Sequence, residues 1–170
     1  FNANSSGVFT RLGFNGNGIE QIDTTNAIAS VFEDIILVNG LGNRAGFTGY
    51  RGTIKAGGTD NFFSRVEATA SSTSYTNGWA SAIVIAGTNH FFSNCITEIS
   101  DAGLVHLSGD FNRVVNHRSD LNYGHGVILV AGSCNFAVLD CITNGRAAAD
   151  TYSGVISTGG SFGGGITGLT

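Results

Sequence analysis

The chain has 170 residues, of which 12% are charged, 42% are hydrophobic and 26 are Gly, and its formal net charge is −4. Charged residues are about half as frequent as in an average soluble domain, and the 8 Lys and Arg form no basic cluster, which argues against a nucleic-acid partner. Apolar runs such as residues 127–131 are far shorter than the ~20 residues that cross a bilayer, so we expect no membrane insertion.

The N-terminal segment 1–18 differs from the rest of the chain. It contains the Gly-rich run 13–18, which indicates turns rather than a phosphate-binding loop. The chain starts at Phe1, with neither an initiator Met nor the apolar core of a signal peptide. We expect residues 1–18 to be an entry segment with an incomplete turn, and residues 19–170 to be one domain that is part of a longer chain.

A recurring pattern follows, in which Gly closes an apolar strand and a polar step leads into a second strand. The closing glycines Gly87, Gly109 and Gly132 recur at nearly equal intervals. Copies of the second strand start near positions 59, 88, 110 and 134, and an earlier copy covers residues 31–35. A repeat of 22 or 23 residues, the spacing of these glycines, predicts supersecondary units that stack on one another.

Stacking in parallel would bury the apolar side chains of each unit against the units above and below. The alignment predicts one column of Phe62, Phe91 and Phe136 and a second column of Phe63 and Phe92. It also predicts two polar columns at bends of the chain, Asn61 with Asn112 and Asn135, and Asn94 with Asn116 and Asp140. The sequence therefore predicts an all-β stack; a β-sandwich is the alternative, although it would not copy a unit of this length.

The three cysteines do not form a disulfide framework. Cys95 and Cys141 occupy equivalent places two periods apart, and two layers of ~4.8 Å exceed the ~7 Å limit for bridged Cα atoms. Cys134 has no matching partner. We expect buried, reduced thiols and no bound metal or other cofactor, because no CxxC occurs and His117 and His125 lack a convincing second ligand pair.

The Gly-closed strands and the Asn-bearing bends resemble the right-handed parallel β-helix proteins, the pectate lyase-like and polygalacturonase-like group to which many phage tailspikes belong. The resemblance covers residues 19–170. It implies a single-stranded parallel β-helix, a solenoid of about six turns. The resembled tailspikes are trimers, so it also implies a homotrimer, with an extracellular or virion-associated (tail) location.

Four insertions between the predicted turns are the expected binding face, because variable loops of such stacks emerge on one side. They cover residues 69–79, 99–103, 119–126 and 144–154. Aromatic rings with polar tips are suited to stacking against sugar rings. The alternative interpretation is that these side chains only cover the ends of strands. The predicted substrate-binding residues are Tyr75, Trp79, Tyr123, Tyr152, Arg118 and Asp150.

Acidic residues near the same edge are candidates for catalysis. The alignment of Asn94 with Asn116 places Glu98 one layer, or ~4.8 Å, from Asp120. Two carboxylates ~5 Å apart suit a retaining glycosidase, and close carboxylates push one pKa upward. Acids on the surface of a stacked sheet are also commonly solvated and inactive, so both interpretations stay open.

The segment that begins at Asp101 is similar to the active-site rung of polygalacturonases, and Gly-His-Gly at 124–126 follows one turn later. The resemblance implies that Asp101 is an acid and His125 the catalytic histidine; Ala102 stands where that family has a second acid. The leading hypothesis is a carbohydrate-binding or polysaccharide-processing β-helix of a phage tailspike-like host-attachment protein, with a polysaccharide or cell-surface glycan as its partner. The alternatives are a glycoside hydrolase or polysaccharide lyase of the polygalacturonase or pectate lyase type and a non-catalytic structural stalk or adhesin.

Overall fold

The structure is a computed structural model that describes residues 1–15, 21–38, 48–69, 77–98, 102–122, 125–129, 134–139, 142–145, 153–157 and 162–167. Within these residues it is all-β, with strands in two sheets and no helix. It accordingly has no helix long and apolar enough to span a membrane in the part of the chain it describes.

In the described residues the larger sheet has 11 strands and the smaller sheet has six. The strands of the larger sheet are β1 (Val8–Thr10), β2 (Gly13–Asn15), β4 (Val31–Val38), β6 (Phe62–Thr69), β8 (Phe91–Ser93), β9 (Ile96–Glu98), β11 (Asn112–Val115), β12 (Arg118–Asn122), β14 (Cys134–Leu139), β15 (Ile142–Gly145) and β17 (Phe162–Thr167). Those of the smaller sheet are β3 (Ile22–Asp23), β5 (Thr48–Ala56), β7 (Asn77–Ile85), β10 (Ala102–His106), β13 (His125–Leu129) and β16 (Ser153–Ser157).

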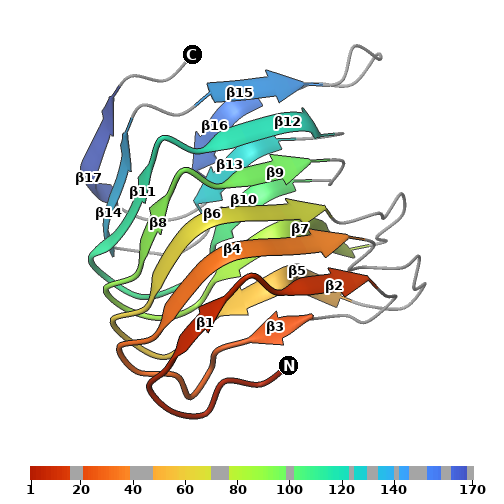
Figure 1. Ribbon diagram of the computed structural model, residues 1–170. Coiled ribbons are helices and arrows are strands. Elements are labelled where there is room, and N and C mark those ends of the chain that lie inside the picture. Colours follow the sequence, from red (N-terminus) through yellow and green to blue (C-terminus); the bar gives the residue numbers. More distant parts are fainter. Residues whose placement is uncertain are drawn as a thin grey trace.

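The chain alternates between the two sheets, and each return to a sheet adds strands beside those of the previous passage. For example, β4, β6, β8 and β11 lie in the larger sheet, whereas β5, β7, β10 and β13 lie in the smaller one. Every strand pairing between these elements is parallel. We call one passage through the larger and then the smaller sheet a layer; the layers follow one another from the N-terminal to the C-terminal end (Figure 1).

The predicted register is confirmed for the middle layers. Phe62 pairs with Phe91 and Phe63 with Phe92, as the alignment predicts. In the next layer Val114 pairs with Phe92, also at the predicted offset. The parallel stacking that the repeat predicts is therefore present.

The predicted register of the following layer is wrong by one position. Asn112 pairs with Phe136, not with Asn135, so Phe136 does not continue the column of Phe62 and Phe91. The offset between β11 and β14 is one position longer than the offset between β10 and β13, where Leu104 pairs with Val127. One extra residue between the end of β13 and β14 shifts the register. Asn135 conceals this shift in the sequence, because it stands where an unshifted repeat would place an Asn.

Strands β1 and β2 bring the N-terminal segment into the larger sheet. Phe9 of β1 pairs with Phe32 of β4, and Phe14 of β2 pairs with Leu37 of the same strand. Asn2 forms a parallel bridge to Asp23. Parts of the segment expected to be an incomplete entry turn, residues 1–18, are therefore paired with the following layer, namely Asn2, Val8–Thr10 and Gly13–Asn15.

Two bends recur from layer to layer. Among the described residues, nine non-glycine positions have positive φ, which is uncommon because Cβ clashes with the backbone there. They form two groups at equivalent places in successive layers: Ala29, Asp60, Asn89 and Phe111 before the larger sheet, and Arg11, Asp34, Arg65, Asn94 and Asn116 within it. Asn and Asp tolerate this conformation best, which explains why the repeat carries them.

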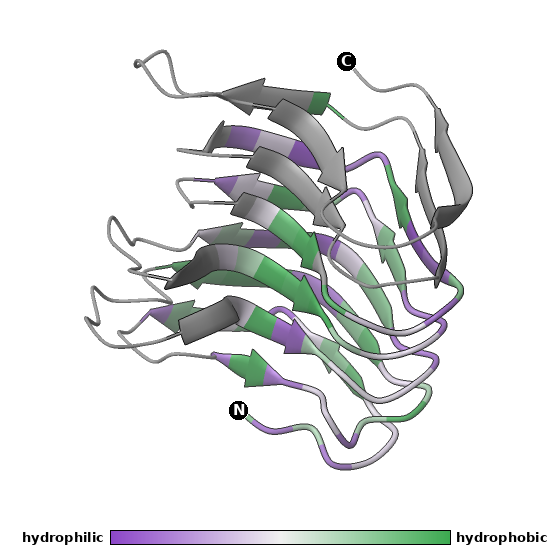
Figure 2. Ribbon diagram, turned by 180° about the vertical axis from the view of Figure 1, so that it is seen from behind, coloured by the Kyte–Doolittle hydropathy of each residue, from purple (hydrophilic) through white to green (hydrophobic). Residues whose placement is uncertain are grey.

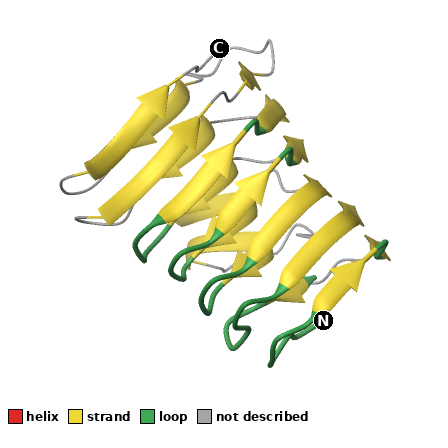
Figure 3. Ribbon diagram, turned by 60° about the vertical axis from the view of Figure 1, so that its left-hand side comes forward, coloured by secondary structure: helices red, strands yellow, loops and turns green. Residues whose placement is uncertain are grey.

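The closing glycines are required by close packing between layers. Gly109 has φ +96°, and a Cβ at this position would lie 1.9 Å from the carbonyl oxygen of Gly87. A Cβ on Gly87 would lie 2.4 Å from the carbonyl oxygen of Gly58 in the preceding layer. The loops that carry these glycines line up along one side of the stack (Figure 3). Any side chain here would push the layers apart.

The core lies between the two sheets and consists of columns of apolar side chains. Phe32, Phe63 and Phe92 are fully buried and stack face to face, with centroids 4.9 and 4.5 Å apart. Apolar residues recur at matching places along successive strands (Figure 2). Cys95 is a free, buried thiol, as expected, and burial raises its pKa to about 11.

A buried polar column runs beside the aromatic stack at the start of the larger sheet. The backbone N–H of Ser30 donates to Asn61 Oδ1 (3.0 Å), that of Asn61 to His90 Nδ1 (3.2 Å), and that of His90 to Asn112 Oδ1 (2.8 Å). Each side chain thus accepts a hydrogen bond from the residue one layer before it. The sequence predicts Asn61 and Asn112 in this role but not His90 between them.

Candidate functional site

The two predicted catalytic acids Glu98 and Asp120 lie side by side. Glu98 ends β9 and pairs with Asp120 of β12, as predicted. β9 and β12 are neighbours in the larger sheet and end on the same side of the stack (Figure 1). The register therefore places the two acidic residues one strand spacing, or ~4.8 Å, apart.

Arg118 binds Asp120 directly. Its Nε donates to Asp120 Oδ2 at 3.0 Å, and its Nη2 forms an ion pair with the same oxygen. The hydrogen bond with Asp120, the charge of Asp120 and the charge of Glu98 raise the pKa of Arg118. The Arg118 guanidinium thus compensates negative charge of the acid pair. The pair therefore differs from two isolated carboxylates that share a proton.

A buried polar cluster lies behind this pair, on the inner face of the sheet. His117 is fully buried, and its Nε2 lies 3.1 Å from the Thr97 hydroxyl. The Thr97 hydroxyl also donates to Ser119 Oγ at 3.4 Å. Burial lowers the pKa of His117 to about 4, so the ring is neutral at pH 7 and its role here is structural.

A cleft of about 350 Å³ opens beside the acid pair on the outer face of the larger sheet. Ile36, Glu67 and Ile96 occupy one register column across β4, β6 and β9 and form part of its wall. Ile96 is also paired with Arg118, so the cleft adjoins the acid pair. The full lining is Asp34, Ile36, Arg65, Val66, Glu67, Asn94 and Ile96.

Ion pairs organise one side of this cleft. Arg65 Nε donates to Asp34 Oδ1 (2.6 Å) and its Nη2 to Asp34 Oδ2 (3.2 Å) and to Glu33 Oε1 (2.7 Å). Hydrogen bonds to Asp34 and then to Glu33 raise the pKa of Arg65, and the bond from Arg65 lowers the pKa of Asp34. On the other side, Asn116 Nδ2 donates to Asn94 Oδ1, which fixes the Asn94 amide at the cleft.

This cleft is absent from the sequence-based prediction, which places binding in the loops. Its residues come from three layers and meet only because Asp34, Arg65 and Asn94 adopt the same left-handed bend. The repeat of polar residues at one place in the unit is the signal that indicates it.

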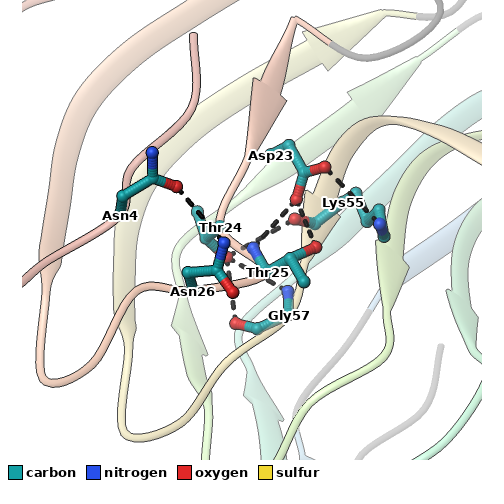
Figure 4. A network of polar contacts seen from close by, with 7 residues as sticks. All are labelled: Asn4, Asp23, Thr24, Thr25, Asn26, Lys55 and Gly57. Carbon is teal, nitrogen blue, oxygen red and sulfur yellow. Dashed lines mark hydrogen bonds and ion pairs between the residues drawn. The ribbon is translucent and has the colours of Figure 1, made fainter.

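A second, polar cleft of about 210 Å³ lies at the corner between β3 and the following loop. Asp23 Oδ1 accepts hydrogen bonds from the Thr25 N–H (2.8 Å) and hydroxyl (2.5 Å), and Lys55 Nζ lies 3.4 Å from Asp23 Oδ2 (Figure 4). Partial burial tends to raise the pKa of Asp23, but the bonds from Thr25 and the charge of Lys55 lower it overall. These polar groups bind one another, so we interpret the corner as a structural turn.

Most of the predicted loop residues lie outside the described residues. Tyr75, Asp101, Tyr123, Asp150 and Tyr152 are in this group. Whether they come together therefore stays a prediction.

Two further predicted residues lie on strands of the smaller sheet. Trp79 of β7 pairs with Tyr50 of β5. His125 of β13 pairs with Ala102 on one side and Ser153 on the other. His125 therefore lies beside Ala102, the residue that replaces the second acid of the polygalacturonase rung.

No protein-family model matches the chain, and no match was found among the curated proteins or the solved structures. Among the residues that the structure describes, no group of three or more His, Cys, Asp or Glu side chains is arranged to hold a metal ion.

Proposed function

We propose that this chain is a right-handed parallel β-helix that binds a polysaccharide on the outer face of its larger sheet. The alternation of the chain between two parallel sheets, the registers of Phe62 with Phe91 and of Phe92 with Val114, and the recurring left-handed bends support this architecture. The described strands form six successive layers, from β1–β3 to β14–β16, followed by β17, and these layers support a β-helix of about six turns.

The observation that carries the proposal is the cleft that crosses three layers beside the acid pair. Its polar groups repeat at the ~4.8 Å spacing of the strands, and a polymer of similar units needs such repeated contacts. The carboxylates, the Asn94 amide and Arg65 are suited to sugar hydroxyls, and Ile36 and Ile96 to the apolar faces of the rings. Sites of this kind combine an apolar floor with a few placed polar groups.

A glycan array with a matched pair of variants tests this proposal. Asn94 and Asn89 have nearly the same φ, 54° and 57°, and each side-chain amide donates one hydrogen bond, but only Asn94 lines the cleft. Gly tolerates this backbone conformation, so Asn94→Gly and Asn89→Gly remove the side chains without backbone strain. We expect Asn94→Gly to weaken the binding of captured glycans about fivefold.

Asn89→Gly should bind those glycans like the wild type. Equal losses in both variants would show that the cleft is not the binding site. An array that captures no glycan with the wild type would overturn the proposal and favour a structural stalk or adhesin.

The trimeric, tailspike-like arrangement is part of the same proposal. An apolar column of Val8, Val31, Phe62 and Phe91 crosses four strands of the outer face, and Phe62 and Phe91 have centroids 5.5 Å apart. Val8 and Phe91 are exposed, and a second copy of the chain would cover such a stripe in an extracellular or virion-associated fibre. Mass photometry should give a trimer for the wild type and more monomer for Phe91→Ser; monomer alone for the wild type would contradict it.

A second candidate, a glycoside hydrolase or polysaccharide lyase, is favoured by the register of Glu98 and Asp120. Glu98→Gln, Asp120→Asn and Asp101→Asn should then lower the release of reducing ends or unsaturated products by at least ~100-fold. Asp60→Asn, which alters an acid at the other bend and outside the cleft, is the matched control. Unchanged product release in all three variants would exclude these acids from catalysis and leave binding alone.

A further inference from the structure

The outer face around the cleft carries more acids than bases among the described residues. Five carboxylates lie in or beside the cleft and its adjoining acid pair, against three guanidinium groups. The carboxylates are Glu33, Asp34, Glu67, Glu98 and Asp120, and the guanidinium groups are Arg11, Arg65 and Arg118. The field over this surface is therefore negative.

Arg65, which lines the cleft, and Arg118, which is paired with Ile96 of the lining, already bind carboxylates. Arg65 contacts Asp34 and Glu33, and Arg118 contacts Asp120. A glycan carboxylate that approached either arginine would have to displace one of these partners. It would also meet Glu67 in the middle of the cleft, which forms no ion pair with any residue in the described ranges.

We infer that the cleft binds a glycan whose sugars carry hydroxyl and amino groups and no acid groups. This inference rests on the proposed function and deepens it by naming the class of ligand. Carboxylates accept hydrogen bonds from sugar hydroxyls and form stronger, charge-assisted ones with ammonium groups. A chain of uronic acids would place like charges side by side, which complementary surfaces avoid.

The inferred ligand class differs from that implied by the polygalacturonase and pectate lyase resemblance, whose substrates are polyuronates. Selection by charge predicts an order of affinities. An amino sugar oligomer should bind more tightly than its N-acetylated counterpart, and a uronic acid oligomer should bind least.

Calorimetric titrations with three hexamers test this order: glucosamine, N-acetylglucosamine and galacturonic acid. The wild type should prefer them in that order, and binding of the glucosamine hexamer should weaken with added NaCl because salt screens charges. The acidic and non-acidic glycans captured on the array provide the same comparison for other backbones, and captured glycans should be non-acidic.

Variants at the centre of the cleft separate local recognition from net charge. Glu67→Gln should weaken glucosamine hexamer binding about fivefold. Asp60→Asn changes the net charge equally but lies at the other bend, outside the cleft, and should bind like the wild type. Glu67→Lys should gain binding to the galacturonic acid hexamer.

Galacturonic acid hexamer binding as tight as that of the glucosamine hexamer, or an array dominated by acidic glycans, would overturn the inference while the proposed function stands. Equal losses in Glu67→Gln and Asp60→Asn would also overturn it, since attraction would then follow net charge alone. If neither the hexamers nor the array show any binding, the proposed function and the inference both fail.

Discussion

The two faces of the larger sheet are built from the same strands but follow different rules. On the inner face, β4, β6 and β8 place Phe32, Phe63 and Phe92 in one column, with rings within 10° of parallel. On the outer face, one column changes from Ile36 to Glu67, Ile96 and then Arg118. Both columns follow the same parallel pairing of strands.

This difference shows where the sequence of a stacked fold is constrained. An inner side chain packs against its equivalents in the layers above and below, so like residues recur. An outer side chain also faces solvent, where charged, polar and apolar residues are all tolerated at small cost. The inner face therefore determines the fold, and the outer face is free to recognise a ligand.

The largest expected effect breaks the inner column at its centre. Phe63 stacks between Phe32 and Phe92, so Phe63→Ala should lower the free energy of unfolding by about 3–5 kcal/mol. Its neighbour Phe62 is only half-buried on the same strand, and Phe62→Ala is the matched control. Urea unfolding should show a clearly smaller loss for the control; equal losses would contradict the assignment of the two faces.

The second effect is a dependence of stability on pH that originates in the interior. The pKa of His117 is about 4 in the folded chain and 6.5 in an ordinary environment, so the unfolded chain binds a proton that the folded chain does not. The free energy of unfolding should therefore fall as the pH drops from about 6.5 to 4, by about 3 kcal/mol in total. Below that range this contribution changes no further.

His117→Gln tests this assignment, since a glutamine can still hydrogen-bond the Thr97 hydroxyl but has no proton to gain. The fall in stability between pH 7 and pH 4.5 should be smaller in this variant than in the wild type. If both fall equally, His117 is not the source of the pH dependence.

The third effect removes one buried amide from the polar column. Asn61 accepts a hydrogen bond from the Ser30 N–H and donates to the carbonyl oxygens of Gly57 (3.1 Å) and Ala27 (3.3 Å). Asn61→Ala leaves these groups unpaired and should cost about 2 kcal/mol. Asn26→Ala removes an exposed amide with a 3.4 Å bond to Asn4 and should change stability little in the same chemical unfolding experiment.

Much of the fold was predictable because the inner columns repeat. The alignment of Phe62 and Phe63 with Phe91 and Phe92 fixes the register of neighbouring strands, and Asn94 and Asn116 form the predicted contact. The wrong register predicted for Asn135 also comes from the repeat. Because of one inserted residue, Asn135 stands where the repeat predicts an Asn, although Phe136 is the residue that pairs with Asn112. Identity at one position cannot distinguish a shifted register from an unshifted one.

The candidate site was less predictable. The adjacency of Glu98 and Asp120 follows from the register, but the ion pair of Arg118 with Asp120 depends on side-chain direction. The cleft arises because Arg65 turns toward Asp34 and Glu33 in the preceding layer. A repeat alignment gives the column of each residue and not the layer toward which its side chain points.

The smallest expected effect lies on the outer face. Arg65→Ala removes exposed ion pairs with Asp34 and Glu33, and such pairs contribute little to stability because water and salt screen them. Its thermal midpoint should change less than those of Phe63→Ala and Asn61→Ala. The control is Arg113→Ala, which replaces an exposed arginine on β11 outside the cleft and should change the thermal midpoint equally little. A loss for Arg65→Ala as large as for Phe63→Ala would show that the outer face also determines the fold.

A crystal structure with a captured oligosaccharide bound tests directly whether the cleft is the binding site. We expect sugar density across β4, β6 and β9, in contact with Ile36, Glu67, Asn94 and Ile96. Density located only in the loops beyond the strands, with the cleft empty, would contradict it.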